Sequence, residues 1–276
     1  MMIDKEKIKI YTNANKDAWN EAMPKHRLIA KEKLDELFLQ KGFVIQDDEN
    51  ILNIFKKYGI ENKNIAHLCC NNGSELLSLK NMNAGKCLGF DISNEAINEA
   101  TERARKSQIN CEFVCCDVFD IESKYYNLFD IVYITIGALG WLPDLKAFFH
   151  IVSKLLKEKG IVIIHELHPF TEILPFDGDE NNLNTKDFIK IIEPYFRNGP
   201  IVENDGIDYI GKTKYNAKTT YWFAHSLSDI INGIVSNDLK IKEFIESPKD
   251  ISTVHKSIEN MNFSLPLSMI FVCEKY

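Results

Sequence analysis

The sequence lacks the features that mark membrane, secreted and nucleic-acid-binding proteins. Its 276 residues contain no apolar run near the ~18 residues of a membrane-spanning helix, and the opening residues are charged. No run of lysine or arginine exceeds two residues, and the net charge is −7. Non-specific binding of nucleic acid needs a basic face. We therefore expect a cytoplasmic monomer or homodimer with no membrane partner and no nucleic-acid partner.

A metal-ligand pattern is also missing. The seven cysteines include no C-x2-C spacing of the kind that zinc sites use. The adjacent pairs at 69–70 and 115–116 fall in short apolar runs, so we expect reduced, buried thiols in strands. His165 and His168 flank Glu166, but on a strand they would face opposite sides. We expect no metal site.

What the chain does contain is a regular alternation of short apolar runs and helix-length amphipathic stretches. This rhythm predicts a mostly parallel sheet with helices on both faces. We expect strands at residues 65–70, 87–90, 112–116, 130–136 and 161–165, and helices at 75–82, 94–107 and 143–157. Further strands are expected at 219–223, 240–246 and 268–273, and a helix at 226–235 that begins with an S-x-x-D box. The last strand has no helix after it, so we expect it to be antiparallel and next to its predecessor.

Composition divides the chain into four parts. Residues 1–60 have helical spacing and predict an N-terminal helical cover, and residues 61–169 hold the alternating core. Residues 170–218 are rich in Asp, Asn, Gly and Pro, with one helical candidate at 185–196. A stretch of that length without strand rhythm is typical of a functional lid or cap. Residues 219–276 complete the sheet.

The first strand of the core ends in a turn that is poor in glycine. It reads Cys69-Cys70-Asn71-Asn72-Gly73 and leads into a helix. A backbone that passes close to a ligand here needs left-handed residues, which glycine and asparagine supply most easily. Free N–H groups at the helix start can then face an anionic or polar group. The turn predicts a cofactor loop.

Two acidic residues strengthen this prediction. Asp91 lies 18 positions after Gly73 (91 − 73), at the end of the second apolar run. A carboxylate there can accept hydrogen bonds from both hydroxyls of a ribose. Asp117 ends the third run, where its oxygens can accept from an adenine amine while Val118 packs on the ring.

Together these motifs resemble the class I S-adenosylmethionine-dependent methyltransferases. The first motif of that family, acid-x-Gly-x-Gly-x-Gly, matches His67, Cys69, Asn71 and Gly73, so three of four positions depart from it. Asp91 and Asp117 match the ribose-binding and adenine-contacting acids. Residues 129–133, 142–144 and 155–160 resemble the fourth strand, the Leu-Pro-Asp of the small-molecule branch and the turn into the fifth strand.

The resemblance implies a Rossmann-like α/β fold: a seven-stranded, mostly parallel sheet with an antiparallel terminal strand, N-terminal helices and an inserted lid. It implies S-adenosylmethionine as cofactor and S-adenosylhomocysteine as product. An N-terminal helix of the family often closes over the cofactor, so Arg27 would meet its carboxylate and Tyr11 or Trp19 would cover it. The expected cofactor-binding residues are Tyr11, Trp19, Arg27, His67, Cys69, Asn71, Gly73, Asp91, Ile92, Asp117, Val118 and Thr135.

Three other interpretations stay open. A nicotinamide dinucleotide enzyme would favour the full G-x-G-x-x-G for its pyrophosphate, and Asp117 would have no standard role in it. A DNA or RNA amino-methyltransferase would resemble its family in Asn/Asp-Pro-Pro-aromatic after the fourth strand, where this chain has Thr135-Ile136-Gly137-Ala138. A non-catalytic nucleoside-binding regulator is supported by the altered first motif.

The methyl acceptor would lie beyond the carboxyl ends of the strands. We expect a small molecule with an O, N or S nucleophile, methylated by in-line displacement, which positioning and desolvation largely promote. The candidate bases are His168 and His225, and the expected pocket residues are Trp141, His168, Tyr221 and Trp222. An apolar or aromatic acceptor is suggested by the aromatic residues of the lid, namely Phe170, Phe176, Tyr195, Phe196, Tyr209 and Tyr215.

Overall fold

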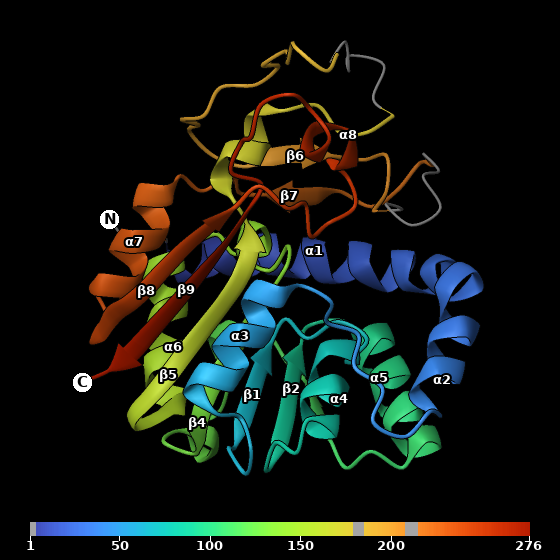
Figure 1. Ribbon diagram of the computed structural model, residues 1–276, viewed down its shortest axis with the longest axis vertical. Helices are drawn as coiled ribbons and strands as arrows, with labels where there is room; N and C mark the ends of the chain where they lie inside the picture. The colour runs from blue at the N-terminus through green and yellow to red at the C-terminus, as the bar shows by residue number, and fades with distance from the viewer. Residues whose placement is uncertain (1–3, 179–184, 208–214) are drawn as a thin grey trace.

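The computed structural model describes residues 4–178, 185–207 and 215–276, and its centre is a seven-stranded sheet (Figure 1). The strand order is β3-β2-β1-β4-β5-β9-β8, and only β9 runs antiparallel to its neighbours β5 and β8. The strands are β1 (Ile65–Leu68), β2 (Cys87–Asp91), β3 (Glu112–Cys115), β4 (Phe129–Thr135), β5 (Leu156–Leu167), β8 (Leu239–Ser247) and β9 (Ser268–Lys275). This order confirms the predicted fold class and the antiparallel last strand.

Helices cover both faces of the sheet. On one face α6 (Leu145–Leu155) and α7 (Leu227–Val235) bury apolar side chains against alternate residues of β1, β2, β4 and β5. On the other face α3 (Glu49–Tyr58) and α4 (Ser74–Asn81) do the same. The strands are apolar on both sides because both faces are covered. The fifth packed helix is α5 (Asn94–Ser107), whose N-cap Ser93 accepts from the Ala96 N–H.

A long N-terminal helix lies across the carboxyl ends of the strands. α1 (Lys5–His26) continues through a π-helical turn, η1 (Arg27–Lys31), into α2 (Glu32–Phe38). In Figure 1, α1 separates the sheet from the segments above it. The Asn15 amide accepts from the Tyr221 N–H at 2.8 Å and donates to the Tyr221 carbonyl at 2.9 Å. The Asn15 side chain on α1 is therefore hydrogen-bonded to the backbone of Tyr221, in addition to the packing between the two segments.

The upper segments differ from the expectation in two places. The stretch 219–223 does not rejoin the main sheet: β7 (Thr220–Trp222) pairs antiparallel with β6 (Ile201–Glu203) in a separate two-stranded sheet. The predicted helix at 185–196 is also wrong, because this stretch is non-helical. Its Ile189 and Tyr195 pack in a small cluster with residues of 173–174 and 258–267, and Pro194 interrupts any helical turn. Tertiary packing overrides the local helical spacing here.

The cysteine pairs also lie elsewhere than expected. Cys69 and Cys70 are in the turn after β1, and Cys115 and Cys116 straddle the end of β3. All seven thiols are free, as expected, but Cys115 is exposed. Across 4–178, 185–207 and 215–276, no helix has both the length and the apolar character required to cross a bilayer.

Candidate functional site

The turn after β1 is built from left-handed residues at alternate positions. Cys69 has φ 53°, Asn71 has φ 46° and Gly73 has φ 77°, whereas Asn72 is not among the positive-φ residues. These three positions are the ones that match the glycines of the first motif. The turn keeps the required backbone path with only one glycine, and the left-handed role expected of Asn72 is taken by Cys69.

Gly73 is needed for packing. A Cβ on it would lie 2.7 Å from the Phe113 ring and 2.9 Å from the Ala100 Cβ. The same ring faces Gly89 of β2, where a Cβ would also meet it at 2.7 Å. At Gly73 the absent side chain makes room for neighbouring protein atoms, so a larger residue there would displace the start of α4.

Asp91 connects the cofactor loop to the end of β2. Its Oδ2 accepts from the Asn71 N–H and its Oδ1 from the Ser93 N–H, both at 2.8 Å. Burial raises the pKa of the carboxyl group, and these backbone donors oppose the rise. The Ile92 N–H is a third backbone donor, so about one of the roughly four acceptor positions of a carboxylate remains for a hydroxyl donor. The neighbouring Ile92 is half-buried, and its carbonyl lies 3.5 Å from the Cys115 Sγ.

Asp117 is held by the N-terminal helix. Its Oδ2 accepts from the Lys9 Nζ and the Thr12 Oγ1, each at 2.7 Å, and its Oδ1 accepts from the Phe119 N–H at 3.0 Å. Lys9 and Thr12 were not expected from the sequence, since they are more than a hundred residues away. Val118 is only 5 % exposed and packs in the core, so it offers little surface to a ring.

A buried charged network supports the loop from behind. The Arg103 side chain, 1 % exposed, donates to the Asn72 carbonyl at 2.7 Å, the Glu99 Oε1 at 2.7 Å and the Asp35 Oδ1 at 2.9 Å. The Asn72 amide also donates to Glu99 at 3.2 Å. The i,i+4 spacing of Glu99 and Arg103 on a helix was the only sequence signal for this network.

Arg27 joins that network instead of reaching toward the loop. Its guanidinium donates to the Glu95 Oε2 at 2.7 Å, to the Glu95 carbonyl, and to the Glu99 Oε2 at 3.1 Å. These contacts of the side chain all lie on α5, and the expected contact of Arg27 with a cofactor carboxylate stays a prediction. Two carboxylates bind the Arg27 guanidinium through charge-assisted hydrogen bonds, which are stronger than its hydrogen bonds to water.

His67 takes the place of the acid in the first motif, but it is fully buried. Its Nε2 lies 2.9 Å from the Thr135 Oγ1, and its Nδ1 has no hydrogen-bond partner among the described residues. Burial lowers the pKa of the ring to about 3. The ring is therefore neutral at ordinary pH and does not replace a carboxylate. The hydrogen bond to Thr135 holds β1 to β4, and the expected contact of His67 with the cofactor stays a prediction.

Five aromatic side chains expected at the site lie close together, two on α1 and three on the segments that pack against it. The rings of Tyr11 and Tyr221 are 4.8 Å apart, those of Trp19 and Trp141 5.5 Å, and those of Trp141 and Trp222 4.9 Å. They come from α1, the turn η4 (Leu139–Trp141) and β7. The sequence placed Tyr11 and Trp19 with the cofactor and the other three with the acceptor, whereas in the fold each of the two α1 rings packs with rings of the expected acceptor group.

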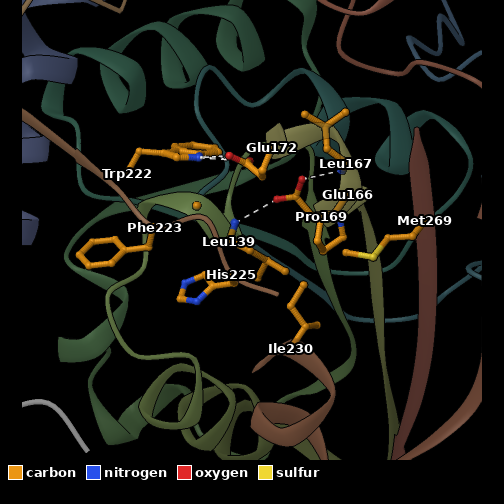
Figure 2. Close-up of a pocket in the computed structure, with 11 residues that line it drawn as sticks. Leu139, Glu166, Leu167, Pro169, Glu172, Trp222, Phe223, His225, Ile230 and Met269 are labelled. Atoms are coloured by element: carbon orange, nitrogen blue, oxygen red, sulfur yellow. Dashed lines mark hydrogen bonds between the residues drawn. The ribbon is translucent and has the colours of Figure 1, made fainter. Parts of the chain in front are cut away.

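A pocket lies beside these rings at the ends of β4 and β5 (Figure 2). With its opening to solvent it encloses about 340 Å³. It is lined by Leu139, Gly140, Glu166, Leu167, Pro169, Glu172, Trp222, Phe223, His225, Ile230 and Met269. The Trp222 ring covers Gly140 so closely that a Cβ there would lie 2.2 Å from it. Of the expected pocket residues, Trp222 lines this space directly.

Two glutamates line the pocket, and Glu172 was not selected from the sequence. Glu166, 4 % exposed, accepts from the backbone N–H groups of Gly137 and Leu167 at 2.8 Å and of Leu139 at 2.9 Å. Burial raises its pKa to about 7. Glu172 accepts from the Trp222 Nε1 at 3.0 and 3.2 Å, and burial raises its pKa as well. Glu166 shapes the loop after β4, while Glu172 has acceptor capacity left.

The two histidines proposed as bases have different surroundings. His225 lines the pocket, and its Nε2 lies 2.8 Å from the Leu142 carbonyl. That contact requires an Nε2–H, so the lone pair of the neutral ring is on Nδ1. Burial lowers the pKa of both His225 and His168.

His168 is not among the residues that line this pocket, and its expected role as base and pocket wall stays a prediction. Its Nδ1 accepts from the Phe170 N–H at 3.1 Å, and its Nε2 lies 3.1 Å from the Glu246 Oε1. Both nitrogens have structural neighbours, and the residue caps the short helix η5 (Pro169–Ile173). Among the residues that the structure describes, no group of three or more His, Cys, Asp or Glu side chains is placed to hold a metal ion.

Comparisons with known proteins agree with this geometry. Residues 61–210 match a family described as a methyltransferase domain. The chain is 30 % identical over 66 residues to an uncharacterized protein of Methanocaldococcus jannaschii (24 % of this chain, 30 % of that one). It is 35 % identical over 74 residues to the zebrafish (Danio rerio) rRNA N(6)-adenosine-methyltransferase METTL5 (26 % and 36 %). The matches thus span about a third of the length of these curated relatives.

Solved structures share the fold at low sequence identity. A putative S-adenosylmethionine-dependent methyltransferase from Listeria monocytogenes has a TM-score of 0.57 and 18 % identity, covering 81 % of this chain and 97 % of that one. The geranyl diphosphate C-methyltransferase of Streptomyces coelicolor, solved with S-adenosyl-L-homocysteine, has a TM-score of 0.54 and 10 % identity, covering 82 % and 78 %.

Proposed function

This chain belongs to the methyltransferase-domain family of S-adenosylmethionine-dependent enzymes with the class I Rossmann-like fold, and we propose that it methylates a small molecule. The observation that carries the proposal is the pocket at the ends of β4 and β5, walled by aromatic side chains beneath α1. Small-molecule sites are typically concave and mostly apolar, with a few oriented polar groups.

The residues of the first loop fit the cofactor. Asp91 keeps acceptor capacity for a ribose hydroxyl beside its backbone donors. The left-handed Cys69 and Asn71 give the turn its close backbone path. Asp117 would accept from the adenine amine beside its contacts with Lys9 and Thr12. The cofactor supplies a methyl group on a sulfonium, whose sulfur leaves as a neutral thioether.

The chain's own residues then have three tasks in an in-line displacement. The aromatic side chains exclude water and orient the acceptor, which favours a displacement that positioning and desolvation promote. Glu166 holds the loop after β4 through three backbone N–H groups. The neutral His225, with its lone pair on Nδ1, is placed to accept a proton where the acceptor must lose one.

A nucleic-acid acceptor is the second candidate, because one relative is named for an rRNA adenosine. Three features favour the small molecule. The net charge is −7, and residues 135–138 read Thr-Ile-Gly-Ala where the amino-methyltransferases of nucleic acids would be expected to have Asn/Asp-Pro-Pro-aromatic. The Trp222 ring also covers Gly140 at the pocket, where a flipped base would need room.

Calorimetry and turnover test the proposal together. The protein is titrated with S-adenosylmethionine, S-adenosylhomocysteine and NAD, then incubated with labelled cofactor and either an rRNA fragment or a panel of amines, phenols, thiols and carboxylates. We expect binding of both adenosyl ligands, no binding of NAD, and label on a panel member. Label on the RNA alone refutes the small-molecule acceptor, and binding without any turnover favours a non-catalytic regulator.

A further inference from the structure

We propose that the acceptor is an amine with an apolar or aromatic body, whose ammonium group is held against Glu172. This inference rests on the proposed function, since it names the acceptor class of the same pocket. It depends on three properties of that pocket: an acidic group with spare acceptor capacity, the lack of a direct ion pair to it among the described residues, and aromatic side chains beside it.

Glu172 has one side-chain donor in the described structure. Its two carboxylate oxygens lie 3.2 and 3.0 Å from the Trp222 Nε1, and a single N–H cannot satisfy about four acceptor positions. Figure 2 shows this carboxylate beside the edge of the Trp222 indole, with a dashed line to its nitrogen. The contact fixes the orientation of the group and leaves acceptor positions open.

No ion pair between the described residues includes the Glu172 carboxylate. Arg197 pairs with Glu193 at 3.1 Å and donates to the Glu172 backbone carbonyl at 3.4 Å, and its charge lowers the pKa of Glu172 without a direct contact with the carboxylate. On α1, Lys9 pairs with Asp117 and Lys25 lies over the Tyr215 ring. Arg197 offsets only part of the cost of burial, because the pKa of Glu172 is still raised. A buried carboxylate without a cation in direct contact is costly, so the pocket favours a ligand that brings a positive charge.

The walls of the pocket suit the same ligand. Trp222 and Phe223 line it, and Trp141 packs edge-on against Trp222 at 4.9 Å. The negative faces of such rings attract an ammonium group, most strongly where water is excluded. An alcohol or phenol of the same size would gain the apolar contacts but would leave the Glu172 charge uncompensated. Discrimination by a charge-assisted hydrogen bond amounts to roughly ten- to a hundredfold in affinity.

The proton balance follows from this contact. The bound R–NH3⁺ gives one proton to the Glu172 carboxylate and becomes R–NH2, which has the lone pair that displacement requires. The nitrogen then forms a bond to the methyl carbon while the carbon–sulfur bond breaks, and the electron pair of that bond goes to sulfur. The products are R–NH2⁺–CH3, S-adenosylhomocysteine and protonated Glu172, which returns its proton to water. Burial, which raises the pKa of Glu172, makes it a suitable acceptor for that proton.

The test compares matched amines and alcohols on the full chain saturated with S-adenosylhomocysteine. Phenethylamine and 2-phenylethanol, with butylamine and butanol as a smaller pair, are titrated by calorimetry. Methyl transfer to each is followed by mass spectrometry with S-adenosylmethionine. We expect an amine to bind at least about tenfold more tightly than its alcohol and to be the methylated compound. Glu172→Gln should abolish that preference, and Glu172→Asp should keep most of it.

Controls separate the possible failures. Glu122→Gln removes an equally charged but exposed carboxylate, which pairs with Lys124, and should change nothing. Trp222→Phe keeps a ring but removes the N–H that orients Glu172, and should reduce the preference only in part. Equal binding of amine and alcohol, failure of every amine to bind, or a preference unchanged in Glu172→Gln overturns the amine proposal. If the wild-type protein does not bind S-adenosylhomocysteine, the proposed function itself is overturned.

Discussion

Replacing Gly73 with alanine should damage the protein far more than the same change at Gly42. Both glycines are left-handed, with φ +77° at Gly73 and φ +79° at Gly42. A Cβ at Gly42 would meet nothing within 4 Å, whereas at Gly73 it would lie 2.7 Å from Phe113 ring atoms and 2.9 Å from the Ala100 Cβ. The pair therefore separates the conformational cost of the backbone from the cost of the steric clash.

The magnitudes follow from these two terms. An L-residue in the left-handed region costs about 1–2 kcal/mol, partly offset by the reduced entropy of the unfolded chain, so Gly42→Ala should cost about 1 kcal/mol. Overpacking adds about 1–3 kcal/mol, so Gly73→Ala should lower the free energy of unfolding by about 2–4 kcal/mol. In a chain of this size each kcal/mol corresponds to roughly 2–4 °C in Tm.

Thermal and urea denaturation of the two variants provide the measurement, with S-adenosylhomocysteine affinity measured in parallel. Since the clash displaces the start of α4, Gly73→Ala should also weaken ligand binding, while Gly42→Ala should not. Equal losses of stability in the two variants would show that the backbone conformation alone matters. The reasoning about Phe113 would then be wrong.

Two further predictions concern the same loop and the strand before it. Asp91→Ala should weaken cofactor binding by about tenfold or more, because the ribose hydroxyls lose their acceptor. Unchanged affinity by calorimetry would contradict the ribose role. The pKa of His67 is lowered to about 3, from about 6.5 in the unfolded chain, so protonation favours unfolding. Stability from this group is complete above pH 6.5 and falls as the pH drops toward 3, by at most about 1.4 kcal/mol per pH unit. Urea denaturation between pH 6.5 and pH 5 measures how the free energy of unfolding changes with pH. This change should be smaller in His67→Gln than in the wild-type protein. An identical change in both proteins would show that His67 does not cause the pH dependence.

Local sequence was enough to predict most elements of the core. Ser226 and Asp229 form the expected reciprocal capping box at the start of α7. Ser93 caps α5 as expected. These features depend on residues three or four positions apart, where backbone geometry brings side chain and N–H together. The alternation of strands and helices depends on equally short-range periodicity, so the sheet and its helices were predictable.

The site was predictable only in part. Its acids and aromatic residues were correctly selected as lying near the strand ends, but their partners come from distant positions. Lys9 meets Asp117 across 108 residues, and Arg27 meets Glu95 across 68. Glu172 gains its importance from the Trp222 indole, 50 residues further along the chain. Neither the spacing of residues nor the composition predicts these contacts, because they arise from the packing of α1 and β7 over the sheet.

The sequence by itself determined the order of the elements, the acids at the ends of β2 and β3, and a loop able to turn with one glycine. The reason is that backbone preferences and strand ends are local properties. Tertiary structure decided that Cys69 and Asn71 share the left-handed positions with Gly73, and that Gly73 makes room for Phe113. It also decided which charges face the pocket, because burial and the lack of a partner are properties of the packed chain.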